Sequence, residues 1–467
     1  MNNKTDIISR FLKKVRLLTN KKSDTKAKAL KLPIEATVMG RAEHCLSRKD
    51  ISEQALKVLY RLHKHGFKAY LVGGSVRDLL LGTRPKDFDV VTDAHPEQIK
   101  KIFNNCRLIG RRFRLAHVYF DRDIIEVATF RAPSPTEETS ERSKEGMILR
   151  DNEYGTIDED VWRRDFTINA LYYNIADFSI VDYTGGLADL KNRTLQIIGE
   201  PYARFREDPV RMLRAIRFAG KMRFQLDPSL LAPMVALLHL LNFVSPARLY
   251  EELVKMIYSG ESLTIFQLLS EYKLFEQLFA ITHHCGQEKS WPVQALLTQV
   301  LLSTDARVKQ QKPVTPAFVL AGLLWYPMLA RALVLQQQSK IGAYNAQAQA
   351  SDEILAEQAK ALSMPRRITH MVREIWRLQL RLERRVSRRV ERLTQEIKFR
   401  AAYDFLLLRA KVEPAMEEVA TWWQAYVEGD ARTRRGLLQG LNKTTAKKRK
   451  AKSVASPAYF PPTDQIE

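Results

Sequence analysis

The sequence predicts an α+β domain on the N-terminal side, with a small mixed sheet and helices, followed by an all-helical region and flanked by basic flexible tails. Between residues 51 and 182, short β-rich runs alternate with helical patterns, whereas after Gly186 amphipathic helical spacing dominates. Residues 1–34 hold ten Lys or Arg against two Asp, and residues 431–453 hold nine basic residues and no acid. Such charge runs are typical of flexible arms or solubilising tails.

The elements of the first domain are expected in a definite order. Residues 51–66 predict a helix with a serine N-cap that ends at Gly66. The polar stretch at 134–146 predicts a mobile loop. Strands are expected at AYLV (69–72), DFDVV (87–91), HVYF (117–120) and IIEVATF (124–130).

The second half of the chain is expected to be helical throughout. Its apolar residues recur at helical spacing, and no fixed-period repeat indicates a solenoid. The predicted amphipathic helices are 207–224, 247–259, 263–279, 315–335 and 368–386.

Composition limits the function classes. The chain has 467 residues, 45% of them hydrophobic, which suits two or three folded domains. A net charge of +22 favours polyanionic partners, with nucleic acid ahead of anionic membrane. No apolar run reaches the roughly 18 residues of a membrane span, and no secretory signal is evident. Cys45, Cys106 and Cys285 are widely spaced, so we expect a soluble cytoplasmic protein without a disulfide scaffold.

The N-terminal arm contains one amphipathic stretch, at residues 8–18. Its apolar side chains share one helical face, and its lysines and arginine lie elsewhere. Such a helix lies on a membrane surface, docks on a partner or packs against the body. Membrane contact by this helix is the less favoured of these alternatives.

One stretch, LVGGSVRDLLLGTRPKDFD at 71–89, carries most of the chemistry. Gly73 and Gly74 follow an apolar strand and begin a helix, a turn that lets backbone N–H groups approach a triphosphate. Asp87 and Asp89 point to one face of an expected strand. Glu126 is an acid among apolar and small residues on another strand. Three carboxylates on neighbouring strands can hold two Mg²⁺ ions, and such a site catalyses nucleotidyl transfer. Taken alone, the glycines could serve only a tight turn, and the acids could simply face solvent.

These residues resemble the head domain of the class II nucleotidyltransferases, the family of CCA-adding tRNA nucleotidyltransferases and bacterial poly(A) polymerases. Further family motifs follow in order: RRDFTINALYYN at 163–174, GGLADLKNRTLQIIG at 185–199 and EDPVRMLRAIRFA at 207–219. The resemblance implies a nucleotidyltransferase catalytic head. It divides the chain into a basic arm (1–50), the head (51–182), a helical neck (183–260), an RNA-binding helical body (261–425) and a flexible tail (426–467).

The resemblance also implies site residues, with ATP as substrate and Mg²⁺ as cofactor. Asp87, Asp89 and Glu126 would bind the metals. Asp165 would be catalytic, or would anchor neighbouring arginines through a buried ion pair. The residues implied in nucleotide binding are Gly73, Gly74, Arg77, Arg163, Arg164, Asn169, Asp208, Arg211 and Arg214.

The motif EDPVRMLRAIRFA indicates how a base would be selected. On a helix, Asp208, Arg211 and Arg214 would share one face. A carboxylate accepts from an exocyclic amine and an arginine donates to a ring nitrogen, so the pair would admit adenine and cytosine and reject guanine and uracil. It would not separate ATP from CTP. An ordinary intrahelical ion pair is the alternative.

Two basic segments indicate RNA contact. Within LIGRRFRLAHVYF at 108–120, the resemblance to bacterial poly(A) polymerases rests on Arg111, Arg112 and Arg114 around Phe113, because CCA-adding enzymes typically carry a shorter, less basic stretch. The later helices add Arg384, Arg385, Arg388 and Arg389. Glutamates lie among these arginines in the sequence, so the alternative to RNA contact is a solvated helix face with salt bridges.

The sequence therefore predicts template-independent addition of AMP from ATP to RNA 3′ ends, with release of pyrophosphate. A role in RNA processing and decay, with RNA-decay proteins as partners, is implied by the resemblance alone. The alternatives are a CCA-adding enzyme and a noncatalytic RNA-binding protein with a degenerate head. His283, His284 and Cys285 are expected at a helix end or surface, because no second cluster completes a tetrahedral metal site.

Overall fold

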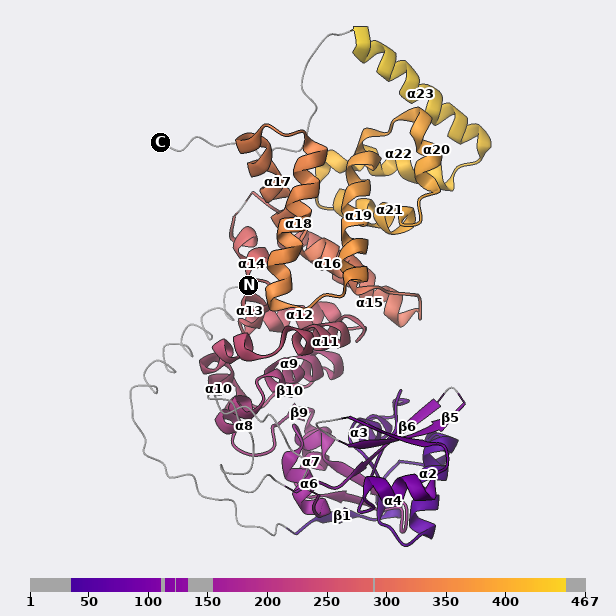
Figure 1. Ribbon diagram of the computed structural model, residues 1–467, viewed down its shortest axis with the longest axis vertical. Helices are drawn as coiled ribbons and strands as arrows, with labels where there is room; N and C mark the ends of the chain where they lie inside the picture. Colours follow the sequence, from indigo (N-terminus) through magenta and orange to yellow (C-terminus); the bar gives the residue numbers. More distant parts are fainter. Residues whose placement is uncertain (1–34, 111–113, 122, 133–153, 289, 451–467) are drawn as a thin grey trace. The chain divides into compact units, whose positions relative to one another are not determined.

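The computed structural model describes residues 35–110, 114–121, 123–132, 154–288 and 290–450. The chain divides into two compact units (Figure 1). Unit 1 runs to Ala215 and includes Arg223–Leu240, and unit 2 consists of Ile216–Met222 and the chain from Leu241 onward. The predicted loop at 134–146, the amphipathic stretch at 8–18, and Arg111 and Arg112 lie outside the described residues.

Unit 1 contains a mixed sheet, eight-stranded among the described residues, in the order β1-β8-β7-β2-β3-β6-β5-β4. Only β3 and β6 run parallel; the other neighbours are antiparallel. The four predicted strands are confirmed as β2, β3, β5 and β6, although β3 begins at Asp89 and not at Asp87. The sheet is larger than expected because it also contains β1, β4, β7 and β8. The strands are β1 (Thr37–Met39), β2 (Ala69–Val72), β3 (Asp89–Thr92), β4 (Cys106–Ile109), β5 (Leu115–Phe120), β6 (Asp123–Thr129), β7 (Leu171–Asn174) and β8 (Ile180–Asp182), with a separate parallel pair β9 (Thr194–Leu195) and β10 (Gln225–Leu226).

Short helices surround this sheet. The predicted helix at 51–66 is confirmed as α2, where the Ser52 hydroxyl accepts from the Ala55 N–H at 3.2 Å, and Gly66 follows at φ 85°. The α-helices of unit 1 are α2 (Glu53–Lys64), α3 (Gly74–Leu80), α4 (Pro96–Ile102), α6 (Ile157–Arg163), α7 (Gly186–Asn192), α8 (Pro201–Glu207) and α10 (Leu231–Ala236); α9 (Val210–Met222) begins in unit 1. The 3₁₀ segments are η1 (Arg41–Glu43), η2 (Arg48–Asp50), η3 (Thr167–Asn169), η4 (Pro228–Leu230) and η5 (Leu238–Phe243), the last of which extends into unit 2.

One hydrophobic core of unit 1 joins three strands. Val72, Val91 and Tyr172 are buried together with Val161 of α6 and Ile198. Burial of each such side chain is worth about 1.5–3 kcal/mol. This packing holds the ends of β2, β3 and β7 in fixed positions.

Unit 2 is helical in its described part, as predicted. Its α17 packs on α18, and α19 packs on α16 and α21. No single described helix is both long and apolar enough to span a bilayer; α16 and α17 meet that test only as a pair, bent by 50°. Besides the end of α9, unit 2 contains α11 (Pro246–Ile257), α12 (Ser262–Glu271), α13 (Leu274–Leu278), α14 (Ala280–Gln287), α15 (Val293–Lys309), α16 (Pro316–Leu323), α17 (Trp325–Ser339), α18 (Ala343–Ala361), α19 (Arg366–Arg384), α20 (Ser387–Thr394), α21 (Phe399–Ala410), η6 (Pro414–Met416), α22 (Glu417–Glu428) and α23 (Ala431–Lys450).

One predicted helix is divided. The single helix expected at 315–335 is two helices, α16 and α17, with the break at Leu324. Pro327 lacks an N–H and is tolerated only in the first turn of a helix, so a new helix begins just before it.

The expected arm and tail were drawn too long. Residues 37–39 of the expected arm form β1, which pairs with β8, and η1 and η2 follow it. At the other end, the expected flexible tail from residue 426 contains α23, whose Leu437, Leu438 and Leu441 pack against the core around Trp423. Charge dominates the composition of both segments. It masked the backbone pairing that holds β1, whose Val38 is 58% exposed, and the leucines that anchor α23.

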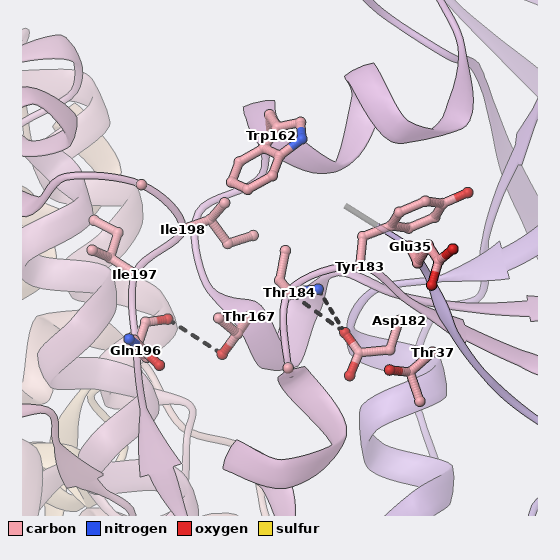
Figure 2. Close-up of a pocket in the computed structure, with 12 residues that line it drawn as sticks. Glu35, Thr37, Trp162, Thr167, Asp182, Tyr183, Thr184, Gln196, Ile197 and Ile198 are labelled. Carbon is pink, nitrogen blue, oxygen red and sulfur yellow. Dashed lines mark hydrogen bonds between the residues drawn. The ribbon is translucent and has the colours of Figure 1, made fainter. Parts of the chain in front are cut away.

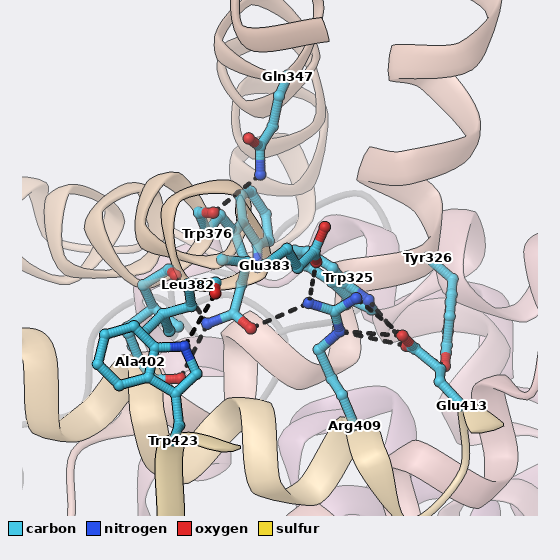
Figure 3. A network of polar contacts seen from close by, with 12 residues as sticks. Trp325, Tyr326, Gln347, Trp376, Leu382, Glu383, Ala402, Arg409, Glu413 and Trp423 are labelled. Carbon is cyan, nitrogen blue, oxygen red and sulfur yellow. Dashed lines mark hydrogen bonds and ion pairs between the residues drawn. The ribbon is translucent and has the colours of Figure 1, made fainter. Parts of the chain in front are cut away.

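A buried ionic network crosses unit 2 (Figure 3). Arg409 is 3% exposed and donates to Glu413, itself 2% exposed, at 2.8 Å and to Glu383 at 2.7 Å. The Tyr326 hydroxyl donates to Glu413 at 2.8 Å, and the Arg409 guanidinium lies 4.3 Å from the ring centre of Trp325. Burial alone would lower the pKa of Arg409, but the two carboxylates raise it above its ordinary value. The network therefore stays charged and ties α16–α17 to α19 and α21.

Candidate active site

Direct strand pairing sets a row of side chains on one face of the sheet. Tyr172 pairs with Val72, Val72 with Asp89, and Asp89 with Glu126. Residues paired directly across neighbouring strands point to the same face, and the strands are roughly 4.8 Å apart. Asp89 and Glu126 are therefore neighbours, and Asp87 lies just before β3. The structure thus places two of the three predicted carboxylates, Asp89 and Glu126, side by side, while the third, Asp87, lies two residues before Asp89 and outside the strand.

The electrostatics of this carboxylate row favour a cation. Burial by surrounding protein raises the pKa of Asp89 to about 6, and the negative charges of Glu126 and Asp87 act in the same direction, while Arg164 opposes them. No three acidic, histidine or cysteine side chains form a ready-made metal cluster among the described residues. Carboxylate oxygens that repel one another are nevertheless the donors that Mg²⁺ prefers, so the residues present fit this ion.

The double-glycine turn lies at the end of the same row. Because Val72 pairs with Asp89, the next residue, Gly73, lies beside the carboxylates. Gly73 has φ 74°, where a side chain would be strained, and a Cβ there would come within 3.7 Å of Arg164 Nη1. The turn therefore leaves a narrow space between backbone and guanidinium, next to Asp89.

A chain of hydrogen bonds runs behind the turn. Arg77 is buried and donates from Nη1 to Asn169 Oδ1 at 2.6 Å and from Nε to Asp78 at 2.8 Å. Asn169 Nδ2 donates to Asp165 Oδ1 at 3.1 Å, and Arg214 Nε donates to Asp165 Oδ2 at 2.7 Å. Arg77, Asn169, Asp165 and Arg214, all predicted at the nucleotide, are thus connected to one another. Their contact with a nucleotide stays a prediction.

Asp165 has the environment of an anchor. Its side chain is 10% exposed and accepts from Arg214, Asn169 and the Phe166 N–H. Burial by itself would raise the pKa of Asp165, but Arg214 and these donors lower it to about 2. Of the two roles considered for Asp165, we infer the structural one, positioning α9 and Asn169.

This anchor predicts a pH dependence of stability. The folded pKa of Asp165 lies below the ordinary value of about 3.9, so its stabilisation of about 2–3 kcal/mol is complete above that pH and is lost as the pH falls toward 2. Asp165→Asn should lower the unfolding midpoint of unit 1 at pH 7, and the difference from wild type should shrink between pH 4 and 2. Thermal unfolding across pH measures it, with Asp50→Asn, an exposed carboxylate, as control. A difference independent of pH would contradict the anchor role.

Arg164 is held by two residues that the sequence analysis missed. Asp160 Oδ2 accepts from Arg164 Nη2 at 2.9 Å, and the Tyr172 hydroxyl accepts from Arg164 Nε at 2.7 Å while donating to Asp160 at 2.8 Å. Burial alone would lower the pKa of Arg164, but Tyr172 and Asp160 raise it. The spacing of Asp160 and Arg164, four residues on a helix, was a usable signal; the contact with Tyr172 depends on the fold.

A second arginine group surrounds Glu207, which was also missed. Arg204 and Arg211 both donate to Glu207 Oε2, and Arg204 Nη2 donates to the backbone oxygen of Arg164 at 2.6 Å. Burial, followed by neighbouring arginines, lowers the pKa of Arg204 to about 10, and the same causes lower the pKa of Arg163 to about 10. The spacing of Glu207 from both arginines, three and four residues, could have revealed this pair.

Asp208 does not lie on the helix that the sequence predicted. It joins α8 to α9 in an extended conformation, φ −147° and ψ 95°, and α9 begins at Val210. Pro209 is the cause, because the residue before a proline is disfavoured in the helical region. Arg211, in the first turn of α9, pairs with Glu207. The expectation of one helical face for Asp208, Arg211 and Arg214 is therefore wrong for Asp208.

The predicted RNA contacts fall in both units. Arg114 pairs with Glu97 in unit 1. In unit 2, Arg384, Arg388 and Arg389 are exposed. Arg385 pairs with Glu418 at 3.0 Å and lies 5.9 Å from the ring centre of Trp422. The expected histidine cluster lies on α14, where His284 Nδ1 is 2.7 Å from the Ala280 oxygen and His283 is 3.7 Å from Glu276.

A cavity of about 390 Å³ lies elsewhere in unit 1 (Figure 2). Trp162 and Ile198 form apolar walls, and Asp182 accepts from the N–H groups of Thr184 at 2.9 Å and Gly186 at 3.1 Å. Its described lining contains none of the three carboxylates. Asp182 therefore stabilises the GGLADL turn, and the cavity is separate from the carboxylate row.

Comparison with known proteins decides the family. Residues 69–196 match the Poly A polymerase head domain, residues 223–285 the family model "Probable RNA and SrmB- binding site of polymerase A", and residues 339–455 the Polymerase A arginine-rich C-terminus. Over 421 residues the chain is 47% identical to the Poly(A) polymerase I of Salmonella typhi, covering 89% of this chain and 90% of that protein. The chain belongs to the poly(A) polymerase I family. The predicted nucleotidyltransferase family is thus confirmed.

CCA-adding enzymes are more distant relatives of this poly(A) polymerase family member. The CCA-adding enzyme of Bacillus pumilus is 36% identical over 224 residues, which cover 48% of this chain and 54% of that enzyme. The solved Thermotoga maritima CCA-adding enzyme complexed with tRNA_CCA aligns with a TM-score of 0.52 at 20% identity, over 85% of this chain and 97% of that one. This likeness shows the fold, an α+β head with helices behind it, as predicted.

Proposed function

We propose that this protein lengthens RNA 3′ ends with AMP from ATP, without a template and with release of pyrophosphate. The observation that carries the reaction type is the direct pairing of Asp89 with Glu126, with Asp87 and the Gly73 turn beside them. Poly(A) synthesis is supported over CCA addition because the poly(A) polymerase relative aligns along nearly the whole chain and the CCA-adding relative along half of it.

Asp87, Asp89 and Glu126 would hold Mg²⁺, which supplies Lewis-acid stabilisation of phosphate charge and a more acidic 3′-hydroxyl. Arg164, fixed by Asp160 and Tyr172, provides a charge that needs no reorganisation beside the reacting phosphate. Because Gly73 has no side chain, a phosphate would be able to approach this guanidinium. The residues thereby orient the triphosphate for in-line attack by the RNA 3′-oxygen on the α-phosphate.

Base selection would fall to the start of α9. Asp208 would accept from the exocyclic amine of adenine and Arg211 would donate to a ring nitrogen, with Glu207 fixing the direction of Arg211. This pair admits adenine and cytosine on hydrogen bonding alone. The break at Pro209 presents Asp208 from a loop, so the preference for ATP over CTP would depend on how that loop is held.

The test is extension of a labelled unstructured RNA with Mg²⁺ and each nucleoside triphosphate separately, beside a tRNA lacking its 3′ CCA. We expect a long ladder with ATP and little extension with the other three. Short additions to the tRNA that need CTP before ATP would identify a CCA-adding enzyme. Binding of RNA without any extension would identify the noncatalytic alternative.

The physiological setting completes the proposal. Action in RNA processing and decay together with RNA-decay proteins, in the cytoplasm, is supported by the family membership and by the sequence. Co-purification with ribonucleases under native conditions tests the partners. Loss of that association at low salt would remove this part of the proposal while leaving the reaction itself unaffected.

A further inference from the structure

A second cavity, of about 480 Å³, lies in unit 2 where α20, the start of α21, α22 and α23 meet (Figure 1). This size is within the roughly 300–1,000 Å³ range of small-molecule sites. Its walls combine aromatic, cationic and hydrogen-bonding side chains. We propose that it binds one nucleotide of single-stranded RNA whose base carries an exocyclic amine, namely an adenylate of the growing tail. This inference rests on the proposed function.

The aromatic wall is rigid. Tyr426 is 6% exposed and stacks against Trp422, with ring centres 5.4 Å apart and planes 9° from parallel. Phe399 stacks in the same way on Tyr403, at 6.0 Å and 9°. Both rings line the cavity and are fixed from behind. A base that contacts these two rings therefore does not have to order them first, so binding loses less conformational entropy.

Polar side chains that line the cavity can still make hydrogen bonds to a ligand. Among the described contacts, Tyr426 and Glu391 accept hydrogen bonds through their backbone oxygens, whereas the Tyr426 hydroxyl and the Glu391 carboxylate, which line the cavity with Gln395, make none. A carboxylate accepts from an exocyclic amine, and an amide or hydroxyl completes a base edge. Adenine, cytosine and guanine carry an exocyclic amine, whereas uracil has carbonyl groups instead, which Glu391 would repel; adenine is the base that the proposed reaction adds to the tail.

The cationic side is suited to the backbone of the RNA. Arg434 is held in place because its Nε donates to the Tyr426 oxygen at 3.0 Å and its Nη2 to the Val427 oxygen at 3.1 Å. Arg435 donates only its Nε, to the Ala431 oxygen at 3.2 Å, in the described contacts. The remaining N–H groups of both guanidinium groups are available to a phosphate. The cavity lining therefore contains both a carboxylate for a base and guanidinium groups for a phosphate.

An exposed apolar side chain lies close in sequence to the cavity. Ile397, between the lining residues Gln395 and Phe399, is 92% exposed. A large aliphatic side chain so open to water would gain by contact with a base or sugar.

The test is fluorescence anisotropy of labelled 12-nucleotide oligo(A) and oligo(U) with the full chain. Glu391→Gln should weaken oligo(A) binding about tenfold and leave oligo(U) unchanged, because only an amine-bearing base uses the carboxylate. Arg435→Ala should weaken both and reduce the slope of log K against log salt by about 0.7. Arg432→Ala, an exposed arginine of α23 outside the lining, serves as the matched control and should change binding less. Tyr426→Phe removes only the hydroxyl and should weaken oligo(A) selectively.

Equal effects of Glu391→Gln on oligo(A) and oligo(U), or equal effects of Arg435→Ala and Arg432→Ala, would overturn the inference. Extension of a trinucleotide primer with ATP tests the proposed reaction separately from binding in the cavity. If the protein extends this primer but the cavity variants bind RNA normally, only the proposed role of the cavity is refuted. If the protein binds RNA through the cavity but extends no RNA, only the proposed function is refuted.

Discussion

Asp89→Asn is expected to reduce AMP transfer by roughly 10³-fold, the equivalent of about 4 kcal/mol in the activation barrier. Asp89 pairs directly with Glu126 and shares its charge environment with Asp87, so the amide removes the central ligand of the carboxylate row. RNA affinity should persist, because the predicted RNA contacts lie on other residues. Extension of oligo(A) with saturating ATP measures the loss, and anisotropy with the same RNA measures the binding.

The same variant has a readout that does not depend on catalysis. Mg²⁺ should raise the unfolding temperature of the wild type, because a ligand that binds only the folded state stabilises it, and should raise that of Asp89→Asn less. Asp123→Asn alters an exposed carboxylate at the start of β6 and should preserve both activity and the Mg²⁺ response. Unimpaired extension by Asp89→Asn would remove the carboxylate row from the reaction.

Arg409→Ala is expected to destabilise unit 2 by about 3–5 kcal/mol. The substitution leaves Glu413 buried at 2% exposure without its guanidinium partner, and an uncompensated buried charge is costly. The hydrogen bonds from Trp325 and Tyr326 to Glu413 remain but do not neutralise it. Thermal or urea unfolding, followed by tryptophan fluorescence, measures the loss, since Trp325 lies in the network.

Two comparisons separate charge burial from lost packing. Lys360→Ala removes one partner of an exposed pair on α18 and should change the midpoint little. Arg409→Met combined with Glu413→Leu removes both charges while keeping volume, and should recover much of the stability lost by Arg409→Ala. A double variant no more stable than Arg409→Ala would show that packing, and not the isolated carboxylate, explains the loss.

Local patterns accounted for much of this protein. The strand before Gly73, the helix after Ser52 and the strand that begins at Asp89 could be predicted because each depends on neighbours a few residues away. The ordered motifs that followed them were enough to predict the family and the reaction. Composition alone led to a wrong prediction for α23. Its many charges suggested a flexible tail, but three leucines anchor it as a helix.

The tertiary structure decided which residues act together. The sequence by itself determined that Asp89, Glu126, Arg164 and Tyr172 are present, and that Asp89 and Glu126 are on strands; the strand that carries Tyr172 was not predicted. Only the register of β2, β3, β6 and β7 made Tyr172, Val72, Asp89 and Glu126 one row, and only the packing of α6 on that row brought Asp160 and Tyr172 to Arg164. The same holds for the cavity between α20, α22 and α23. The physical reason is that strand register and helix packing are set by the burial of a whole face, a property of distant segments that no short window contains.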